Sequence, residues 1–191
     1  MHTEFSIKDG MLNPKKVVHK AIASGMKALA ITDATAMFGD VIFYKAASAA
    51  GIKPILGADC SITNHYNRDD YLRLLFLARN HQGYLTLCDL LSRAWLTNQY
   101  KDRGEVDLDW ITPEMADGLI VLSGFNTGAI GKAILNGSSS AAEQEARRLS
   151  QKFPHFFMEL QRVGRPNDEM LVAESVKLAK KLGLPVVATQ P

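Results

Sequence analysis

Strand-like and helix-like patterns of hydrophobic residues alternate along the whole chain. Short apolar runs, typical of strands buried in a parallel sheet, are followed by longer segments in which apolar residues recur every three or four positions. The expected strands are 28–32, 54–59, 72–78, 119–122, 156–161 and 186–189, and the expected helices are 14–24, 39–50, 81–95, 127–136, 140–153 and 168–182. This alternation predicts an α/β fold, either an open doubly wound sheet or a closed β/α barrel.

Capping signals mark the ends of several expected helices. Asn13 followed by Pro14 is a favourable N-cap and first-turn pair. Asn80 and Asn167 are predicted to cap the helices that follow them, and the segment 140–143 reads as a capping box, Ser-x-x-Glu. These signals divide the chain into elements without indicating a linker or an internal repeat.

The composition indicates which broad class of protein this is, but it says little about the function. The chain has 191 residues, of which 47% are apolar and 22% charged, and this predicts one globular domain over residues 1–191. A net charge of +2 is too small for the field of a dedicated nucleic-acid binder, so nucleic acid is neither implied nor excluded. Its two cysteines are too few for a disulfide framework. No membrane span or signal peptide is visible, which predicts a soluble cytoplasmic protein.

Polar residues at the ends of the expected strands are the candidates for a functional site. In both α/β architectures functional groups gather at the carboxyl ends of the strands. The residues at these ends are Asp33, Asp59, Ser123 and Gln190, joined by His2 if a strand precedes it. Only His2, Asp33 and Asp59 carry side chains that are good metal ligands. The two aspartates equally suit turn or capping roles, in which a carboxylate accepts hydrogen bonds from the backbone.

Seven segments, met in order along the chain, resemble the PHP (polymerase and histidinol phosphatase) family, in the form found at the N-terminus of bacterial DNA polymerase III alpha subunits. They are HTEFSIKDG (2–10), AITD (30–33), FYKAA (43–47), GIKPILG (51–57), GY (83–84), LSG (122–124) and FMELQ (157–161). The resemblance implies an irregular, TIM-barrel-like β/α barrel of about seven strands, here incomplete at its C-terminal end. It also implies that the catalytic polymerase domains of a longer parent chain lie downstream.

Active members of this family hold a small group of metal ions with His, Asp, Glu and Cys and hydrolyse phosphoesters. By resemblance, His2 matches the second histidine of an opening His-x-His pair, Asp33 the carboxylate of a Thr-Asp-His motif, and Asp59 a position usually held by glutamate. We therefore expect no catalytic or cofactor-binding residues, with His2, Asp33 and Asp59 as vestigial metal positions. Divalent metal ions are expected only in the downstream polymerase domain of the parent.

This expectation rests on four departures from the family pattern. Ala34 replaces the histidine of the Thr-Asp-His motif, and Arg73 falls where a strand histidine is expected. Phe125 stands near a cysteine or histidine position, and residues 190–191 replace an Asn-Asp or similar pair. A cation at position 73 would repel a metal ion, so a lost site is the leading hypothesis.

The resemblance predicts a non-catalytic structural domain that docks the proofreading exonuclease subunit. Other polymerase holoenzyme subunits are expected partners, and DNA is reached through the parent chain. The competing hypothesis is an active metal-dependent phosphoesterase or 3′–5′ exonuclease. A third is a single-stranded DNA contact through the basic loop 162–165. An incomplete barrel would also leave an unpaired strand edge, which predicts self-association.

Overall fold

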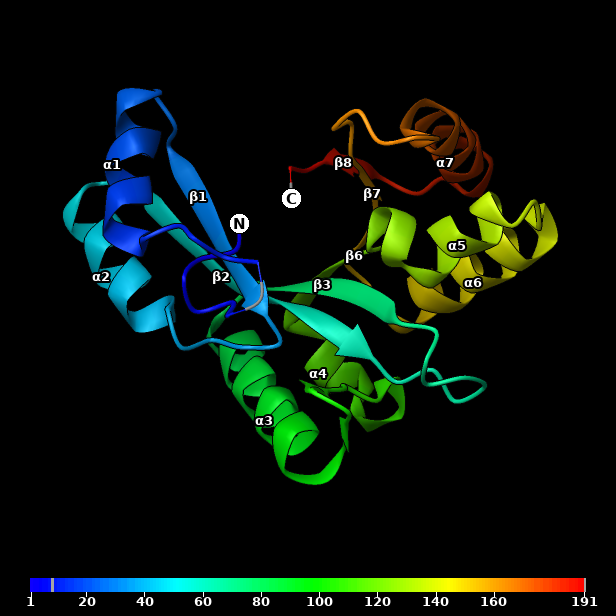
Figure 1. Ribbon diagram of the computed structural model, residues 1–191, viewed down its shortest axis with the longest axis horizontal. Coiled ribbons are helices and arrows are strands. Elements are labelled where there is room, and N and C mark those ends of the chain that lie inside the picture. The colour runs from blue at the N-terminus through cyan, green and yellow to red at the C-terminus, as the bar shows by residue number, and fades with distance from the viewer. Residues whose placement is uncertain (8, 191) are drawn as a thin grey trace.

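A curled six-stranded sheet organises the computed structural model, which describes residues 1–7 and 9–190 (Figure 1). Its strands, in spatial order, are β1 (Ala28–Ala34), β2 (Lys53–Ile62), β3 (Leu72–Ala78), β6 (Leu119–Leu122), β7 (Phe156–Leu160) and β8 (Val186–Ala188). Strand β3 is antiparallel to both of its neighbours, β2 and β6, whereas the remaining pairs are parallel. Strand β3 therefore points opposite to the other strands of this sheet.

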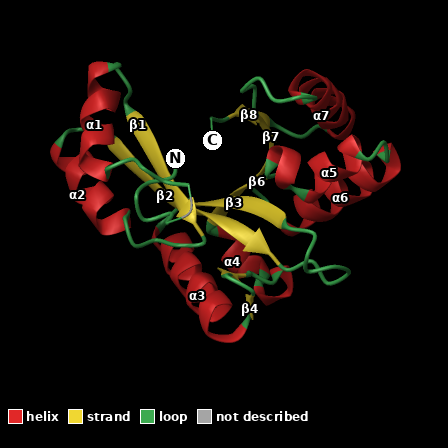
Figure 2. Ribbon diagram, in the orientation of Figure 1, coloured by secondary structure: helices red, strands yellow, loops and turns green. Residues whose placement is uncertain are grey.

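Helices cover the outer, convex side of the sheet (Figure 2). They are α1 (Pro14–Ala23), α2 (Asp40–Ala49), α3 (His81–Thr97), α4 (Pro113–Asp117), α5 (Ala129–Leu135), α6 (Ser139–Lys152) and α7 (Asp168–Leu182). Two 3-10 turns, η1 (Leu108–Trp110) and η2 (Phe125–Thr127), and a ribbon of β4 (Gln99–Tyr100) with β5 (Arg103–Gly104) lie between them. None of the helices in the described ranges is long and apolar enough to cross a membrane.

The alternation of side chains along each strand separates a packed face from an open one. In β3, Leu74 and Phe76 are buried in the main core on the helix-covered side, and the ring of Phe76 meets that of Phe153 edge-on at 5.9 Å. The intervening residues, Leu75 and Leu77, face the concave side and line a cavity. The hydrophobic core thus fixes the sheet from outside and leaves its inner face available for a site.

The predicted α/β class is confirmed, and several element boundaries match closely. Strands 72–78 and 119–122 and the helix 168–182 have the predicted bounds. Asn13 accepts a hydrogen bond from the backbone N–H of Lys16 at 3.3 Å, and Asn80 from that of Gly83 at 2.9 Å, so both predicted caps are confirmed. Strand β2 runs to Ile62, three residues beyond the predicted end.

Two predicted side-chain caps do not form, although the helix that follows Asn167 begins at Asp168 as predicted. Gly137 adopts a positive φ of 71° directly after α5, so the chain enters α6 early and Ser138 becomes its N-cap, without a side-chain bond. The predicted capping box at 140–143 consequently lies inside the helix. Asn167 has a φ of 72° and makes no side-chain cap. The carboxylate of Asp168 instead accepts hydrogen bonds from the N–H groups of Val163 and Arg165, both at 3.0 Å.

Candidate functional site on the concave face of the sheet

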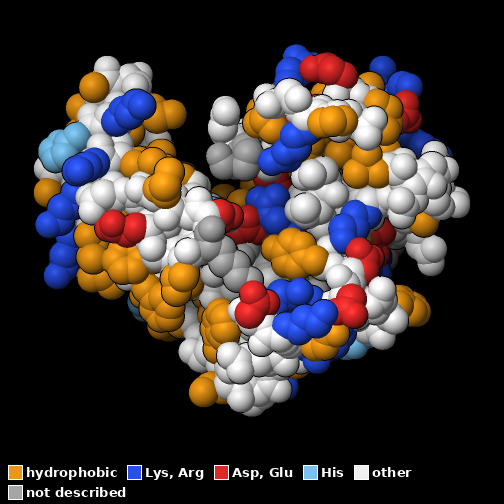
Figure 3. Space-filling model, in the orientation of Figure 1, with side chains coloured by type: hydrophobic (Ala, Val, Ile, Leu, Met, Phe, Trp, Pro, Cys, Tyr) orange, Lys and Arg blue, Asp and Glu red, His pale blue; other side chains and the backbone are white. Residues whose placement is uncertain are grey.

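The concave face of the sheet encloses a cavity of about 800 Å³. Figure 3 shows the surface hollowed there, with acidic and basic side chains in the hollow. Most of the cavity wall is apolar, contributed by inward-facing residues of the strands: Leu29, Leu75, Leu77, Ile120, Leu122, Phe157 and Val187. Polar side chains occupy one end: His2, Asp59, Arg73, Glu159, Gln161 and Thr189. This polar end is the candidate site.

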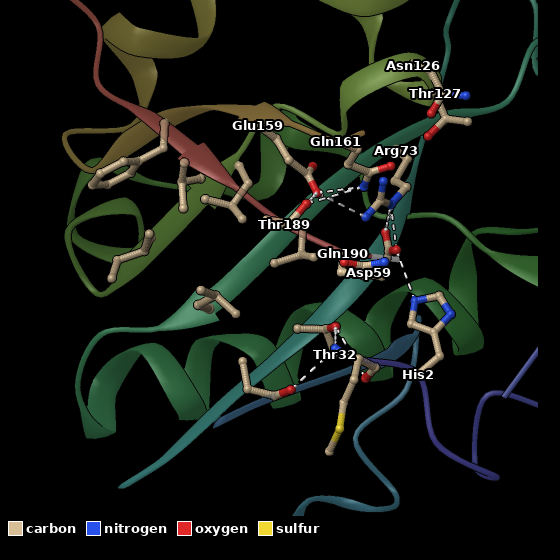
Figure 4. A pocket seen from close by; sticks show the side chains of 18 of the residues that line it. His2, Thr32, Asp59, Arg73, Asn126, Thr127, Glu159, Gln161, Thr189 and Gln190 are labelled. Carbon is tan, nitrogen blue, oxygen red and sulfur yellow. Dashed lines mark hydrogen bonds and ion pairs between the residues drawn. The ribbon is translucent and has the colours of Figure 1, made fainter. Parts of the chain in front are cut away.

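The reversed direction of β3 brings Arg73 into the site. Arg73 is the second residue of β3, whereas Asp59 and Glu159 lie towards the carboxyl ends of β2 and β7. Because β3 runs antiparallel, its first residues meet the last residues of its neighbours. A basic side chain from one strand therefore lies between two acidic side chains from others (Figure 4).

Arg73 is held by both carboxylates. Its Nε donates to the two carboxylate oxygens of Asp59, an Nη atom lies 3.6 Å from Oε1 of Glu159, and Nη1 donates to the carbonyl of Gly124 at 3.4 Å. The side chains of Arg73, Asp59 and Glu159 are only 12%, 6% and 0% exposed. Burial alone would lower the pKa of Arg73, but the charges of Asp59 and Glu159 outweigh it and raise that pKa above its ordinary value. The guanidinium therefore remains a permanent cation in this site.

Glu159 has further partners that saturate its oxygens. It accepts hydrogen bonds from the backbone N–H of Gly124 at 3.0 Å, from Nε2 of Gln161 at 3.0 Å and from the hydroxyl of Thr189 at 2.6 Å. Its own backbone N–H donates to Oγ of Ser123 at 2.9 Å. A carboxylate with this many donors is fixed in place.

His2 extends the charged group to the mouth of the cavity. Its Nε2 lies 3.1 Å from Oδ2 of Asp59 and its Nδ1 lies 3.0 Å from each carboxylate oxygen of Asp9. The hydrogen bond to Asp59 is the main cause that raises the pKa of His2 above its ordinary value, burial opposes it, and Asp9 adds to the rise. Both ring nitrogens are therefore engaged with carboxylates.

Asp33 lies apart from His2 and Asp59. In the register of β1 against β2, Asp33 is opposite Ala58 and Ala34 is opposite Asp59. Neighbours in register share a face, so the side chain of Asp33 points to the packed side and the methyl group of Ala34 takes the place beside Asp59. The structure thus brings two of the three predicted metal positions together and separates the third.

Asp33 instead anchors the N-terminal segment to the end of β1. It is fully buried and accepts hydrogen bonds from the backbone N–H of Thr3 at 2.5 Å, from the hydroxyl of Thr3 at 2.7 Å and from that of Ser6 at 2.7 Å. The Ser6 oxygen in turn accepts from the N–H of Ala34 at 2.9 Å. These partners lie 30 and 27 positions away in the sequence, so Asp33 joins two distant segments and does not fill the local turn or capping role that was the alternative prediction.

The other positions that the sequence analysis singled out do not all lie in the cavity. Ser123 is buried beside Glu159, Gln190 lines the cavity, and Pro191 lies outside the described residues. Phe125 is buried with a positive φ of 43°. Sequence reasoning missed Glu159 and Gln161 as site residues, although two polar residues spaced by two in an apolar strand must share one face. This spacing in the sequence could have identified both residues as members of the site.

The two arginines of the basic loop 162–165 form ion pairs and hydrogen bonds with other residues of the chain. Arg162 pairs with Glu169 at 2.8 Å, and Arg165 donates to Gln161 at 3.1 Å and to Asn126 at 3.2 Å. Two backbone N–H groups of the loop bind Asp168, as described above. Part of the charge and hydrogen-bonding capacity of this loop is therefore used within the chain, which weakens the hypothesis of a single-stranded DNA contact there.

The residues of the polar end do not fit a cluster of metal ions. A metal site requires several free lone pairs converging on one point, with room for the ion. Here Asp59 and Glu159 direct their oxygens at the Arg73 guanidinium, and His2 is engaged through both nitrogens. Arg73 supplies the positive charge that an ion would otherwise bring.

Comparison with known proteins agrees with the sequence motifs. A family model described as the PHP domain matches residues 1–163. The chain is 46% identical over 197 residues to the DNA polymerase III subunit alpha of Neisseria meningitidis serogroup B, covering 100% of this chain and 17% of that relative. It is 40% identical over 190 residues to the DNA polymerase III subunit alpha of Escherichia coli (strain K12), covering 99% of this chain and 16% of the relative. The chain thus spans about a sixth of the length of these relatives.

Two solved structures share the fold at low sequence identity. An amidohydrolase from Chromobacterium violaceum superimposes with a TM-score of 0.67 at 14% identity, covering 99% of this chain and 84% of that one. A protein described as a metal-dependent phosphoesterase, from Bifidobacterium adolescentis, gives 0.61 at 13% identity, covering 98% and 84%. The predicted TIM-barrel-like architecture is thereby confirmed, in the form of a curled half-barrel sheet.

Proposed function

Because the chain belongs to the PHP domain family, we propose that it is a non-catalytic structural and docking domain of a replicative DNA polymerase III alpha subunit. The parent chain would perform DNA-directed DNA synthesis in the cytoplasm. Its polymerase domains, with their divalent metal ions, would lie downstream of residue 191. The names of the relatives support this assignment. The other holoenzyme subunits would be partners, and DNA would be reached through the parent chain.

The observation that carries the non-catalytic assignment is the position of Arg73 between Asp59 and Glu159. Phosphoester hydrolysis at a metal centre needs an ion to activate water and to stabilise the developing charge. A guanidinium has no open coordination position and cannot lower the pKa of a bound water in this way. The cation at this point therefore stabilises the fold by pairing two buried carboxylates.

The competing function is a metal-dependent phosphoesterase, as one structural neighbour is described. The group His2, Asp9 and Asp59 at the cavity mouth is the observation in its favour. Two measurements distinguish these functions: elemental analysis for bound metal, and an assay for hydrolysis of bis-p-nitrophenyl phosphate with added Mn²⁺ or Zn²⁺. We expect no hydrolysis. Metal-dependent turnover that disappears in Asp59→Asn would favour the phosphoesterase.

The docking partner that we propose is the proofreading exonuclease subunit. Exposed apolar side chains around the start of α2 offer a surface: Phe38 lies just before the helix and Val41 and Ile42 lie in its first turn, exposed by 70%, 55% and 40%. Figure 3 shows hydrophobic side chains gathered over this part of the molecule. Such a patch is typical of protein–protein contacts.

Calorimetric titration with the purified exonuclease subunit tests this surface. The double variant Phe38→Ser and Val41→Ser should weaken binding at least about tenfold, because it removes the apolar anchors. The matched control is Leu96→Ser on α3, which is 83% exposed and outside the patch. Absence of binding by the unmodified chain would contradict the docking function.

A further inference from the structure

His65, Asp107 and Asp109 form a cluster of potential metal ligands outside the concave site. One ligand atom from each lies within 4.8 Å of the others. The imidazole Nε2 of His65 is 3.3 Å from the carboxylate of Asp107. The cluster lies on the wall of a second groove, bounded by the ends of β2 and β3, by η1 and by α5 and α6.

The backbone on both sides of the cluster is fixed by buried hydrogen bonds. The N–H of Thr63 donates to the carbonyl of Val106 at 3.0 Å, and the N–H of Val106 donates to that of Ser61 at 2.8 Å. Ser61 and Val106 are buried. These two hydrogen bonds join the segment around Thr63 to the segment around Val106. His65 follows Thr63 by two residues and Asp107 follows Val106 directly, so the ligands come from two segments that are already joined.

The Asp107 side chain is also oriented before any ion arrives. Its Oδ1 accepts a hydrogen bond from the backbone N–H of Asp109 at 3.0 Å, at the start of η1. The side chain of His65 is 61% exposed and that of Asp107 17% exposed. One ligand is therefore held in place, and the imidazole has the freedom to close on it.

Among the residues that the structure describes, the lysine and arginine side chains of this groove pair with carboxylates other than those of Asp107 and Asp109. Lys132 pairs with Asp70 at 2.6 Å, and Arg148 makes a two-point contact with Glu145 at 2.6 and 2.8 Å. Arg148 lies near enough to Asp109 to feel its charge, but its hydrogen bonds go to Glu145. A neutral His65 would then offer a lone pair beside two negative oxygens, which is the donor set of a cation site.

We propose that His65, Asp107 and Asp109 bind a divalent transition-metal ion of the Zn²⁺ class, which braces the loop 63–71 against η1. One imidazole nitrogen and two carboxylate oxygens suit such an ion better than Mg²⁺ or Ca²⁺, which prefer oxygen ligands alone. Ligands about 2.1 Å from Zn²⁺ lie about 3.4 Å apart in a tetrahedron, so ligand atoms now up to 4.8 Å apart must approach by up to about 1.4 Å, with water in the fourth position.

This site differs from the expectation that the chain takes no cofactor. That expectation covered the whole chain and followed from the loss of the family's metal positions on the concave face; the proposed site shares none of those positions. Its role would be structural, because a surface loop gains a cross-link to the 3-10 turn. The proposal does not depend on the proposed function of the domain.

Calorimetric titration of the chain with ZnCl₂ in a non-chelating buffer tests the site. His65→Gln and Asp109→Asn should each weaken binding at least about tenfold, since each removes a ligand that contacts the ion. The matched control is His155→Gln, because His155 and Asp117 form a similar pair at 3.4 Å. Thermal unfolding of each variant without metal checks that the fold is intact.

The signals of the imidazole rings in NMR spectra locate the bound ion. We expect the His65 ring to shift on addition of Zn²⁺ and the His155 ring to remain unchanged. Binding by the unmodified chain that is unaffected by His65→Gln and by Asp109→Asn, or that is no stronger than binding by the chain carrying both of these changes, would overturn the proposal. Binding lost instead in His2→Gln would also overturn it and would place the ion on the concave face, which contradicts the proposed function separately.

Discussion

Arg73 donates through Nε to both carboxylate oxygens of Asp59, and neither side chain is more than slightly exposed. Replacing Arg73 by Ala would leave Asp59 and Glu159 buried without their shared cation. Removing one partner from a buried pair typically costs about 3–5 kcal/mol of unfolding free energy. Urea denaturation followed by circular dichroism should show a loss of this size.

The control for this change is Arg79→Ala. Arg79 pairs with Asp117 at 3.5 Å, but both side chains are well exposed, so its loss should cost at most about 1 kcal/mol. Equal effects of the two changes would contradict the role assigned to Arg73.

Asp33 should contribute to stability through its three hydrogen bonds to Thr3 and Ser6. Asp33→Ala would leave buried donors without an acceptor, and we expect a loss of at least about 2 kcal/mol. Hydrogen exchange should also become faster in residues 3–6, because their anchor is gone. An unchanged exchange rate there would refute the anchoring role.

Asp40 should make the chain less stable as the pH rises. Both of its carboxylate oxygens are buried without a hydrogen-bond partner among the described residues. Burial, and then the charge of Asp33, raise the pKa of Asp40 from its ordinary 3.8 to about 8. The folded state therefore keeps a proton that the unfolded state has lost between about pH 4 and pH 8, and stability falls across that range.

The variant Asp40→Asn should remove this fall, since its side chain does not ionise. Urea midpoints at pH 5, 6.5 and 8 should show a gain over the unmodified chain that is largest at pH 8. Asp117→Asn, at an exposed position, is the control. Parallel pH profiles for the unmodified chain and Asp40→Asn would show that Asp40 ionises normally.

Self-association through the free edge of β8 is a further expectation. Met158 N–H donates to the carbonyl of Pro185, and Thr189 N–H donates to that of Leu160, so residues 185, 187 and 189 face β7. The backbone groups of Val186 and Ala188 then face outward along an open edge. Sedimentation velocity should show concentration-dependent dimers that Ala188→Pro suppresses. A monomer at all concentrations would contradict this expectation.

Local signals predicted much of the fold, because strand length and helix capping are encoded within a few residues. The strand 72–78 and the helix 168–182 were placed by apolar runs and by Gly183, which ends the helix with a φ of 67°. Strand direction was not predictable, since an apolar run reads the same in a parallel and an antiparallel strand. The reversal of β3, and with it the contact between Arg73 and its carboxylates, came only from the structure.

Which residues lie in the site depends on the register of β1 against β2, and the sequence alone did not predict that register. His2 and Asp59 were correctly expected to lie at one end of the sheet. Whether Asp33 joined them depended on which residue of β2 it faced, and a shift of one position would have exchanged its place with that of Ala34. Glu159 was missed although it lies in the family-like segment 157–161, because no ligand position was assigned to that segment and only the spacing from Gln161 marked it as a site residue.

The contact of Arg73 with Glu159 spans the strand that separates them. Strands β3 and β7 flank β6 and do not pair with each other, yet a single side chain joins them on the concave side. A brace on the inner surface of a bent sheet opposes its flattening. The length of one arginine side chain thus helps to set the radius of curvature of the half-barrel, a mechanical role that a shorter residue at position 73 could not fill.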